Sequence, residues 1–296
     1  MRARAVPVIL TVMNKRELEP GIFTELAGRT TYGDYLQLDR LLSAQVPRSQ
    51  PPHHDELLFI IQHQTSELWM KLLIHELTAC IRYVQSDKLE PSFKIFARVG
   101  NIQRMLFEQW SVLETLTPNE YLEFRAALGH ASGFQSFQYH AVEMLLGAKD
   151  AKTLGPFKHV PAQFAELERL LESPSLYDEF LRHLARMGHS IPADHAQRDW
   201  RLPYEKSEQV VEVFRRIYEN TEKHWDAYEM CEKLVDTEER FQLWRYRHMM
   251  TVMRIIGFKQ GTGGSSGVTF LRRALDTRFF PELWDVRTEL APPGGR

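Results

Sequence analysis

The chain has 296 residues, 43% of them hydrophobic and 26% charged, and 37 basic side chains nearly balance 39 acidic ones. This length suits one large domain or two small ones, and the formal charge of −2 argues against a nucleic-acid binder that neutralises phosphates. The two cysteines, Cys80 and Cys231, exclude a disulfide framework or a thiolate metal cluster and fit a reducing cytoplasm.

Both ends of the chain are expected to be flexible. Residues 5–13 loosely resemble a secretory signal, but the run contains Pro7 and lacks a small-residue cleavage site. No stretch approaches the ~20 apolar residues of a membrane span, so we expect no membrane binding. Together with the charge balance and the two cysteines, this predicts a cytoplasmic protein that binds no nucleic acid. The predicted division is a leader over residues 1–24, a single domain over 25–290 and a tail over 291–296.

Apolar positions recur at helical spacing along almost the whole chain, and the alternation typical of strands is absent, which predicts an all-α fold. A short helix is expected over residues 32–43. A long one over 55–84 would span roughly 45 Å at about 1.5 Å per residue. Another follows Pro91 and runs to about residue 115. A capping box with proline at the first helical position then predicts a helix over 117–128.

The second half of the chain continues as helices separated by glycines and polar connectors. The expected helices cover residues 136–146, 162–172, 176–187, 206–235 and 238–256, and two short ones follow a glycine-rich segment at 257–267. Together these elements predict a bundle of long helices with a smaller helical lobe, or insertion, at about residues 150–200.

Several metal and nucleotide motifs are absent. No Glu-x-x-His, His-Glu-x-x-His or Cys-x-x-Cys occurs, which argues against a di-iron carboxylate bundle, a zinc hydrolase and a zinc ribbon. The glycine cluster at 261–267 lacks the Gly-Lys-Ser/Thr of a phosphate-binding loop. It is either a linker between helices or a loop whose backbone N–H groups close over an anionic ligand, and spacing alone does not decide.

Three positions are candidates for chemistry, each with a structural alternative. His63 follows Phe59 by one helical turn, so the pair is either part of the core or an aromatic wall with an imidazole that holds a polar N–H. His248 lies on an apolar helical stripe, as a buried core histidine or a haem iron ligand would. Tyr121 and Arg125 share one face of a short helix, where the arginine is either solvent-exposed or grips a carboxylate.

Five segments closely resemble the tryptophan 2,3-dioxygenase family, and they occur in the family's order over about residues 25–290. They are residues 31–36 (TYGDYL), 53–69 (HHDELLFIIQHQTSELW), 132–136 (SGFQS), 244–248 (WRYRH) and 261–267 (GTGGSSG). The resemblance implies an all-α, cytoplasmic homotetramer with one haem b per subunit, active as Fe(II). Such an enzyme inserts both atoms of O2 across the indole C2–C3 bond of L-tryptophan, giving N-formyl-L-kynurenine in the first step of the kynurenine pathway.

The resemblance also implies residue roles. His248 corresponds to the axial haem ligand, His63 to the catalytic residue that faces the indole N–H, and Arg125 to the group that binds the substrate carboxylate. The remaining implied substrate contacts are Phe59, Ile60, Ile61, Gln62, Tyr121 and Thr262, with Tyr32, Tyr35 and Leu36 in an element that reaches a neighbouring subunit's pocket; Trp110, Ser132 and Gly133 are implied to line the haem pocket.

The sequence leaves the role of His63 open and allows three alternative functions. His63 either abstracts the indole proton or only positions the ring, and we favour positioning because an addition that keeps the N–H needs no base. The rivals are a haem dioxygenase of broader indoleamine scope, a helical haem sensor or carrier, and a cofactor-free scaffold. A carrier has no use for a carboxylate clamp, so Arg125 and Thr262 argue for the enzyme.

Overall fold

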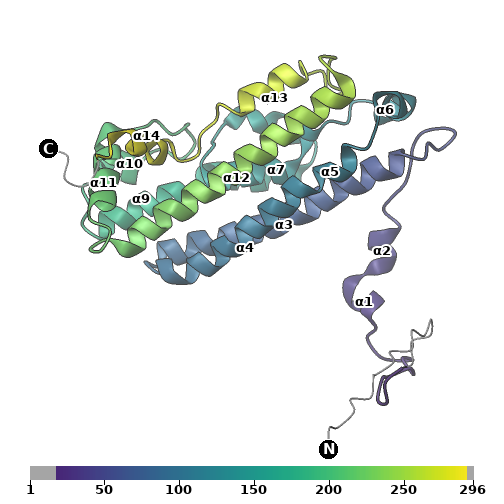
Figure 1. Cartoon of the computed structure of the whole chain (residues 1–296), viewed down its shortest axis with the longest axis horizontal. Helices are drawn as coiled ribbons and strands as arrows, with labels where there is room; N and C mark the ends of the chain where they lie inside the picture. Colours follow the sequence, from purple (N-terminus) through teal and green to yellow (C-terminus); the bar gives the residue numbers. More distant parts are fainter. Residues whose placement is uncertain (1–17, 292–296) are drawn as a thin grey trace, which may run out of the picture. The chain divides into compact units, whose positions relative to one another are not determined.

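The computed structural model describes residues 18–291, and in that range the chain forms helices and turns but no strand (Figure 1). The predicted all-α fold is therefore confirmed. The chain divides into two compact units, Met1–Gln45 and Val46–Arg296. Most of the predicted leader and of the predicted tail lies outside the described residues, so the division into leader, domain and tail stays a prediction.

The first unit contains two short helices where one was expected. They are α1 (Tyr32–Leu36) and α2 (Leu38–Leu42), and Gln37 between them has a left-handed φ of 53°. A capping box formed by Thr31 and Asp34 begins α1. Neither helix has a buried residue. Since helices this short are marginal without packing, nothing in residues 18–45 holds the pair in one straight helix.

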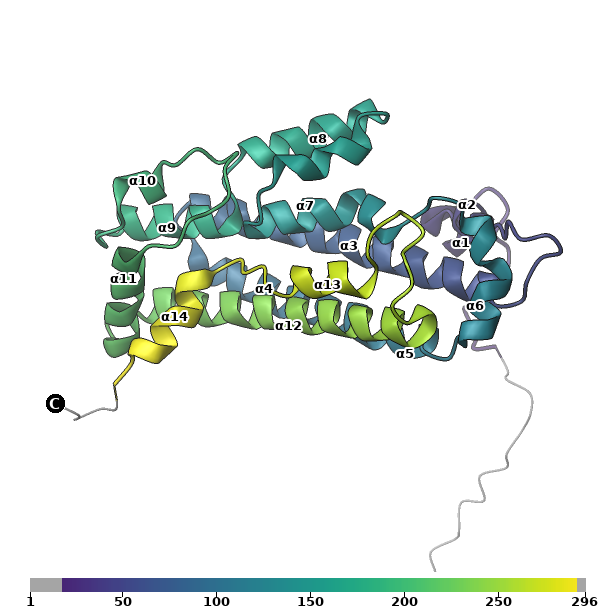
Figure 2. The same ribbon diagram turned by 90° about the horizontal axis from the view of Figure 1, so that it is seen from above.

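Three long helices form the axis of the second unit. They are α3 (Glu56–Gln85, 30 residues), α4 (Leu89–Glu108) and α12 (Trp225–Ile256, 32 residues). A tight turn with Asp87 at φ 57° reverses the chain between α3 and α4. In Figures 1 and 2, α4 lies alongside both α3 and α12. The long helix predicted at 55–84 is confirmed, and it carries the middle of the core.

The predicted boundary between the last two long helices is wrong. Instead of 206–235 and 238–256, the chain forms α11 (Glu208–Glu219) and then the single helix α12. The break falls at Asn220, which leaves the helical conformation, and a turn to His224 begins α12. Thr237 does not interrupt α12, because its hydroxyl donates to the carbonyl of Lys233 one turn earlier.

The remaining helices begin and end close to the predicted caps and glycines. The capping box of Thr117 and Glu120 begins α6, and α7 starts after the Ser136 cap and stops at Gly147. The second predicted long helix breaks at Gln109, which separates α4 from α5. The further elements are α5 (Trp110–Leu113), α6 (Pro118–Arg125), η1 (Ala126–Leu128), η2 (Gly133–Gln135), α7 (Phe137–Leu146), η3 (Ala151–Phe157), α8 (Pro161–Glu172), α9 (Leu176–Arg186), α10 (Ala193–Ala196), α13 (Val268–Ala274) and α14 (Pro281–Glu289).

The region of the predicted small lobe shares the main core. Helix α9 packs against α3, and its Phe180 and Leu184 are fully buried. Helix α8 packs on α7, on the outer side of the bundle in Figure 2. Within residues 18–291, none of the helices has both the length and the apolar character to cross a membrane.

Candidate functional site

The first wall of the candidate site is a pair of rings on α3. Phe59 and His63 lie one turn apart with ring centroids at 4.2 Å, and His63 Nδ1 is 2.7 Å from the Phe59 carbonyl oxygen. Because a carbonyl only accepts, Nδ1 must carry the proton and donate. Burial lowers the pKa of His63, so the ring is neutral at neutral pH. The Nε2 lone pair is therefore the acceptor that His63 offers to a ligand.

Helix α6 adds aromatic surface to this wall. Its capping box fixes the start of the helix, and Tyr121 and Phe124 then follow on its buried side. Phe59 lies 5.9 Å from the Tyr121 ring and 5.6 Å from the Phe124 ring, measured between centroids. The three rings form an apolar cluster beside the His63 imidazole. Such a surface suits a flat aromatic ligand with one polar N–H.

Arg125 is the last residue of α6, and one N–H group of its guanidinium has no hydrogen-bond partner among the described residues. Its Nη2 donates to the Gln260 carbonyl at 2.6 Å, while its Nε is buried and has no partner in the part of the chain that the structure describes. Burial raises the pKa of the neighbouring Tyr121 hydroxyl, and the hydrogen bond and the charge of Arg125 partly offset this rise. A guanidinium whose Nε–H is buried and unpartnered is a site for an anionic group, a carboxylate above all.

The glycine-rich segment is folded against the site. The Thr262 hydroxyl donates to the Ala131 carbonyl at 2.5 Å. A Cβ on Gly263 would lie 2.6 Å from the Ser132 Cβ, so a side chain at position 263 would collide with the segment over residues 130–136. The segment therefore packs against residues 131 and 132, and its closure over an anionic ligand stays a prediction.

His248 occupies an aromatic slot on α12. The Trp110 ring stacks on it at 4.9 Å with an interplanar angle of 11°, and Trp244 lies 6.0 Å away. Burial lowers the pKa of His248 to about 4, with a further contribution from His63. Neither ring nitrogen of His248 forms a hydrogen bond with another residue between 18 and 291, so a neutral imidazole lone pair is available.

These features fit a haem. A single neutral imidazole in an apolar aromatic slot is the environment of an axial iron ligand. The indole nitrogens of Trp110 and Trp244 are buried and, among the described residues, have no acceptor. Ser132 packs against Gly263 of the glycine loop, and Gly133 follows it in the chain. The chemistry of the donor set thus agrees with the implied group.

Comparison with known proteins decides the family. The model of the family described as "Tryptophan 2,3-dioxygenase" matches residues 19–173 and 212–290. The chain belongs to the tryptophan 2,3-dioxygenase family. It is 85% identical to the tryptophan 2,3-dioxygenase of Myxococcus xanthus, with 96% of this chain and 98% of that protein covered. The enzymes of the same name from Serratia proteamaculans and Xanthomonas campestris are 60% and 59% identical, over 94% and 95% of this chain and 99% and 96% of theirs.

Not every residue implied by the family motifs joins this cluster. Phe59 and His63 share one side of α3, so the positions between them point elsewhere. Ile61 is 43% exposed, Ile60 is half-buried, and Gln62 is buried with its side-chain nitrogen unpartnered among the described residues. The three N-terminal residues implied by the family motifs lie in the other unit and are solvent-exposed in the single chain: Tyr32, Tyr35 and Leu36.

A carboxylate that the sequence did not reveal supports the His248 slot. Glu114, just after α5, forms a bidentate ion pair with Arg247 at 2.9 and 3.0 Å and accepts from the Thr251 hydroxyl at 3.2 Å. The hydrogen bond from Arg247 holds the pKa of Glu114 below its ordinary value. The pair ties α5 to α12 and so fixes the Trp110 ring against His248. Only Arg247, inside the motif at 244–248, carried a signal in the sequence.

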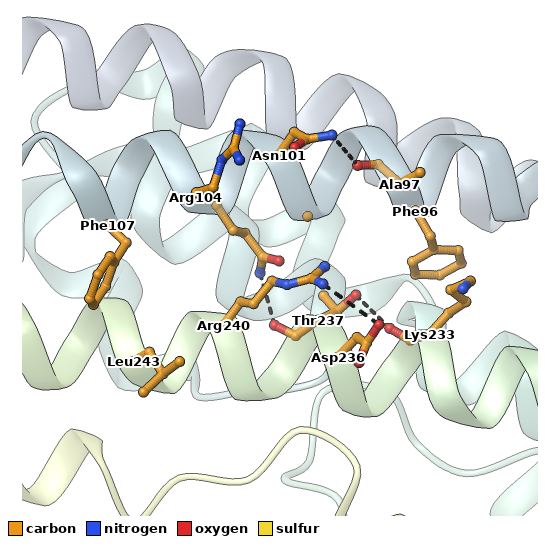
Figure 3. A pocket seen from close by; sticks show the side chains of 12 residues that line it. Phe96, Ala97, Asn101, Arg104, Phe107, Lys233, Asp236, Thr237, Arg240 and Leu243 are labelled. Atoms are coloured by element: carbon orange, nitrogen blue, oxygen red, sulfur yellow. Dashed lines mark hydrogen bonds and ion pairs between the residues drawn. The ribbon is translucent and has the colours of Figure 1, made fainter.

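A groove of about 490 Å3 between α4 and α12 lies apart from these residues, and Figure 3 shows the side chains that line it. It contains none of the candidate site residues. Its basic side chains Arg104, Arg240 and Lys233 each pair with an acidic residue one turn away, at distances between 2.9 and 3.7 Å. The residues lining this groove therefore offer an anionic ligand no unpaired cation.

Proposed function

We propose that the chain is a haem-dependent dioxygenase that inserts both atoms of O2 across the indole C2–C3 bond of L-tryptophan. The product is N-formyl-L-kynurenine, at the first step of the kynurenine pathway. Family membership supports the reaction. The observation that carries the residue assignment is the convergence of a neutral His63, an aromatic wall and the unpartnered Nε of Arg125 in one cluster.

His248 would hold haem b through its iron, with one haem per subunit in the Fe(II) state. Its neutral imidazole and the stacked Trp110 support this assignment. We assign Trp110, Ser132 and Gly133 to the lining of the pocket. When bound, the haem would supply the redox-active iron needed for chemistry with O2.

The residues opposite His248 bind and orient tryptophan. The indole ring packs on Phe59, and its N–H donates to His63 Nε2. The carboxylate binds Arg125. The Thr262 hydroxyl already donates to Ala131, so its oxygen is free to accept from the substrate ammonium group. Held in this way, the C2–C3 bond meets O2 without a bimolecular encounter. His63 positions the ring and removes no proton, since an addition that keeps the N–H needs no base.

We assign the chain to the cytoplasm and to a homotetramer in which the first unit completes a neighbouring pocket. Its Tyr32 and Tyr35 side chains are 76% and 80% exposed, which is typical of aromatic residues that a partner covers. Both cysteines are buried and free, as a reducing compartment permits. Ile60, Ile61 and Gln62 belong to the same proposal as residues of the substrate segment.

Turnover of the haem-loaded, reduced protein tests the function. We expect L-tryptophan to give N-formylkynurenine, followed by absorbance, and tryptamine to give none because it lacks the carboxylate that Arg125 binds. Turnover of both substrates would support the indoleamine dioxygenase of broader scope. A haem-loaded protein that leaves tryptophan untouched would support the sensor or carrier, and a protein that takes up no haem would contradict the assignment of His248.

A further inference from the structure

A buried charged cluster lies behind the site and has no place in the chemistry described above. It consists of His140 and Glu143 on α7 and Arg245 on α12, one turn before His248. Arg245 Nη2 donates to Glu143 Oε1 at 2.6 Å, and His140 Nδ1 is 3.2 Å from Glu143 Oε2. His140 is only 2% exposed. Buried charges of this kind are costly unless each is paired, so the cluster calls for an explanation.

His140 links the Glu143 carboxylate to the segment over residues 130–136. Nδ1 faces the Glu143 carboxylate, and Nε2 lies 2.8 Å from the Phe134 carbonyl oxygen. Burial alone would raise the pKa of Glu143, but the hydrogen bond from His140 and the charge of Arg245 hold it below its ordinary value, so the carboxylate is ionised. The ring therefore lies between two acceptors, with one at each ring nitrogen.

The groups that face His140 are the Glu143 carboxylate, the Phe134 carbonyl and the rings of Phe134, Tyr139 and Phe157. Burial raises the pKa of Tyr139, so its hydroxyl stays protonated. The Arg245 guanidinium donates to Glu143, to the Tyr139 hydroxyl at 3.1 Å and to the Ala274 carbonyl at 3.1 Å, and it lies over three aromatic faces. Glu143 thus pairs with Arg245 and is also bonded to His140.

The carbonyls held by this cluster belong to the segments that flank the glycine loop. Phe134 lies in the segment 130–136, which carries the Ala131 carbonyl that Thr262 binds and the Ser132 side chain against which the loop packs. Ala274 ends α13, the helix that follows the loop. The cluster therefore ties both flanks of the loop to α7 and α12, the helix of His248.

We propose that His140 is a positioning residue for the substrate, whose ring holds the segment 130–136 where the Thr262 loop closes over the amino-acid head group. This inference rests on the proposed function for its substrate. It concerns a residue that never touches tryptophan and acts through the Phe134 carbonyl.

Two substitutions separate positioning from simple stability. His140→Phe keeps a ring of similar size but removes both hydrogen bonds. His183→Phe is the matched control, because His183 is also buried and bonded to a carboxylate, Asp87 at 2.8 Å, but lies in α9 away from the loop. Both variants are expected to lower the Tm. Only His140→Phe is expected to raise KM for L-tryptophan, by about tenfold, with kcat within about threefold, since a looser loop costs binding that substrate and transition state share.

Hydrogen exchange supplies a readout that does not depend on turnover. In the protein without substrate, the amides of Gln135 and Ser136, bonded to Ser132 and Gly133 carbonyls, are expected to exchange faster in His140→Phe and at the original rate in His183→Phe. An unchanged KM, or exchange in the segment 130–136 that matches the control, would overturn the proposal. If the unmutated protein does not oxidise tryptophan, the proposed function fails, whereas the exchange experiment still tests the role of His140.

Discussion

Replacing Arg125 with alanine tests whether its guanidinium binds the substrate carboxylate. The buried Nε has no partner among the described residues, and a planar fork presents a second N–H beside it to a carboxylate. A hydrogen bond to a charged group contributes about 1.5–3 kcal/mol, and removing one side of a buried charge pair costs about 2–5 kcal/mol. We therefore expect a loss of about 2–4 kcal/mol, or an increase of about 30- to 1000-fold in the Kd for L-tryptophan.

The assay is equilibrium titration of the haem-loaded variant with L-tryptophan and, separately, with tryptamine. Arg125 also donates to the Gln260 carbonyl, so its removal could loosen the glycine loop as well. Tryptamine separates these effects, because it has no carboxylate to lose. We expect its Kd to change by less than about threefold, which is less than ~1 kcal/mol. An unchanged Kd for tryptophan, or equal losses for both ligands, would refute a direct contact between Arg125 and the carboxylate.

Three further predictions test other parts of the account. His63→Ala should retain measurable turnover with haem intact, because the residue positions the ring; complete loss of turnover would instead make it a base. Gly263→Ala should raise KM and cost about 1–3 kcal/mol of stability, since its Cβ would lie 2.6 Å from that of Ser132; an unfolding curve and KM equal to the wild type would contradict the close approach. The hydrogen bond from Arg186 lowers the pKa of Asp87, so its stabilisation is present above the unfolded pKa and is lost as pH falls through the lower folded value. Urea unfolding of Asp87→Asn and wild type should therefore differ at pH 6 and converge towards pH 3, and a constant difference would count against this ion pair.

Local chemistry made much of the fold predictable. The box at Thr117 and the stop at Gly147 were read correctly because caps and glycines act over one helical turn. The boundary between α11 and α12 was predicted wrongly, because Glu238 lies inside α12 and does not begin a helix. Its carboxylate accepts the backbone N–H groups of Phe279 and Phe280, both at 3.0 Å. These partners lie about forty residues further along the chain, so a pattern within a few residues of Glu238 could not predict the contact.

The candidate site shows the same limit. Spacing alone paired Phe59 with His63, since both lie on one helix, and the structure confirms their contact. Arg125, Thr262 and His248 could be joined only through the family resemblance, because they come from α6, a loop and α12. The supporting roles of four other residues could not be predicted from sequence motifs, because their contacts join different elements. These residues are Glu114, His140, Glu143 and Arg245.

The most direct test of the central claim is the origin of the oxygen atoms in the product. Haem-loaded, reduced protein is mixed with L-tryptophan under labelled O2, and the N-formylkynurenine is analysed by mass before exchange with water. The account predicts a product that carries both atoms of one O2 molecule. A product with one labelled atom, or with none, would contradict the proposed insertion of O2 across the indole double bond, and with it the roles proposed for His63, Arg125 and His248.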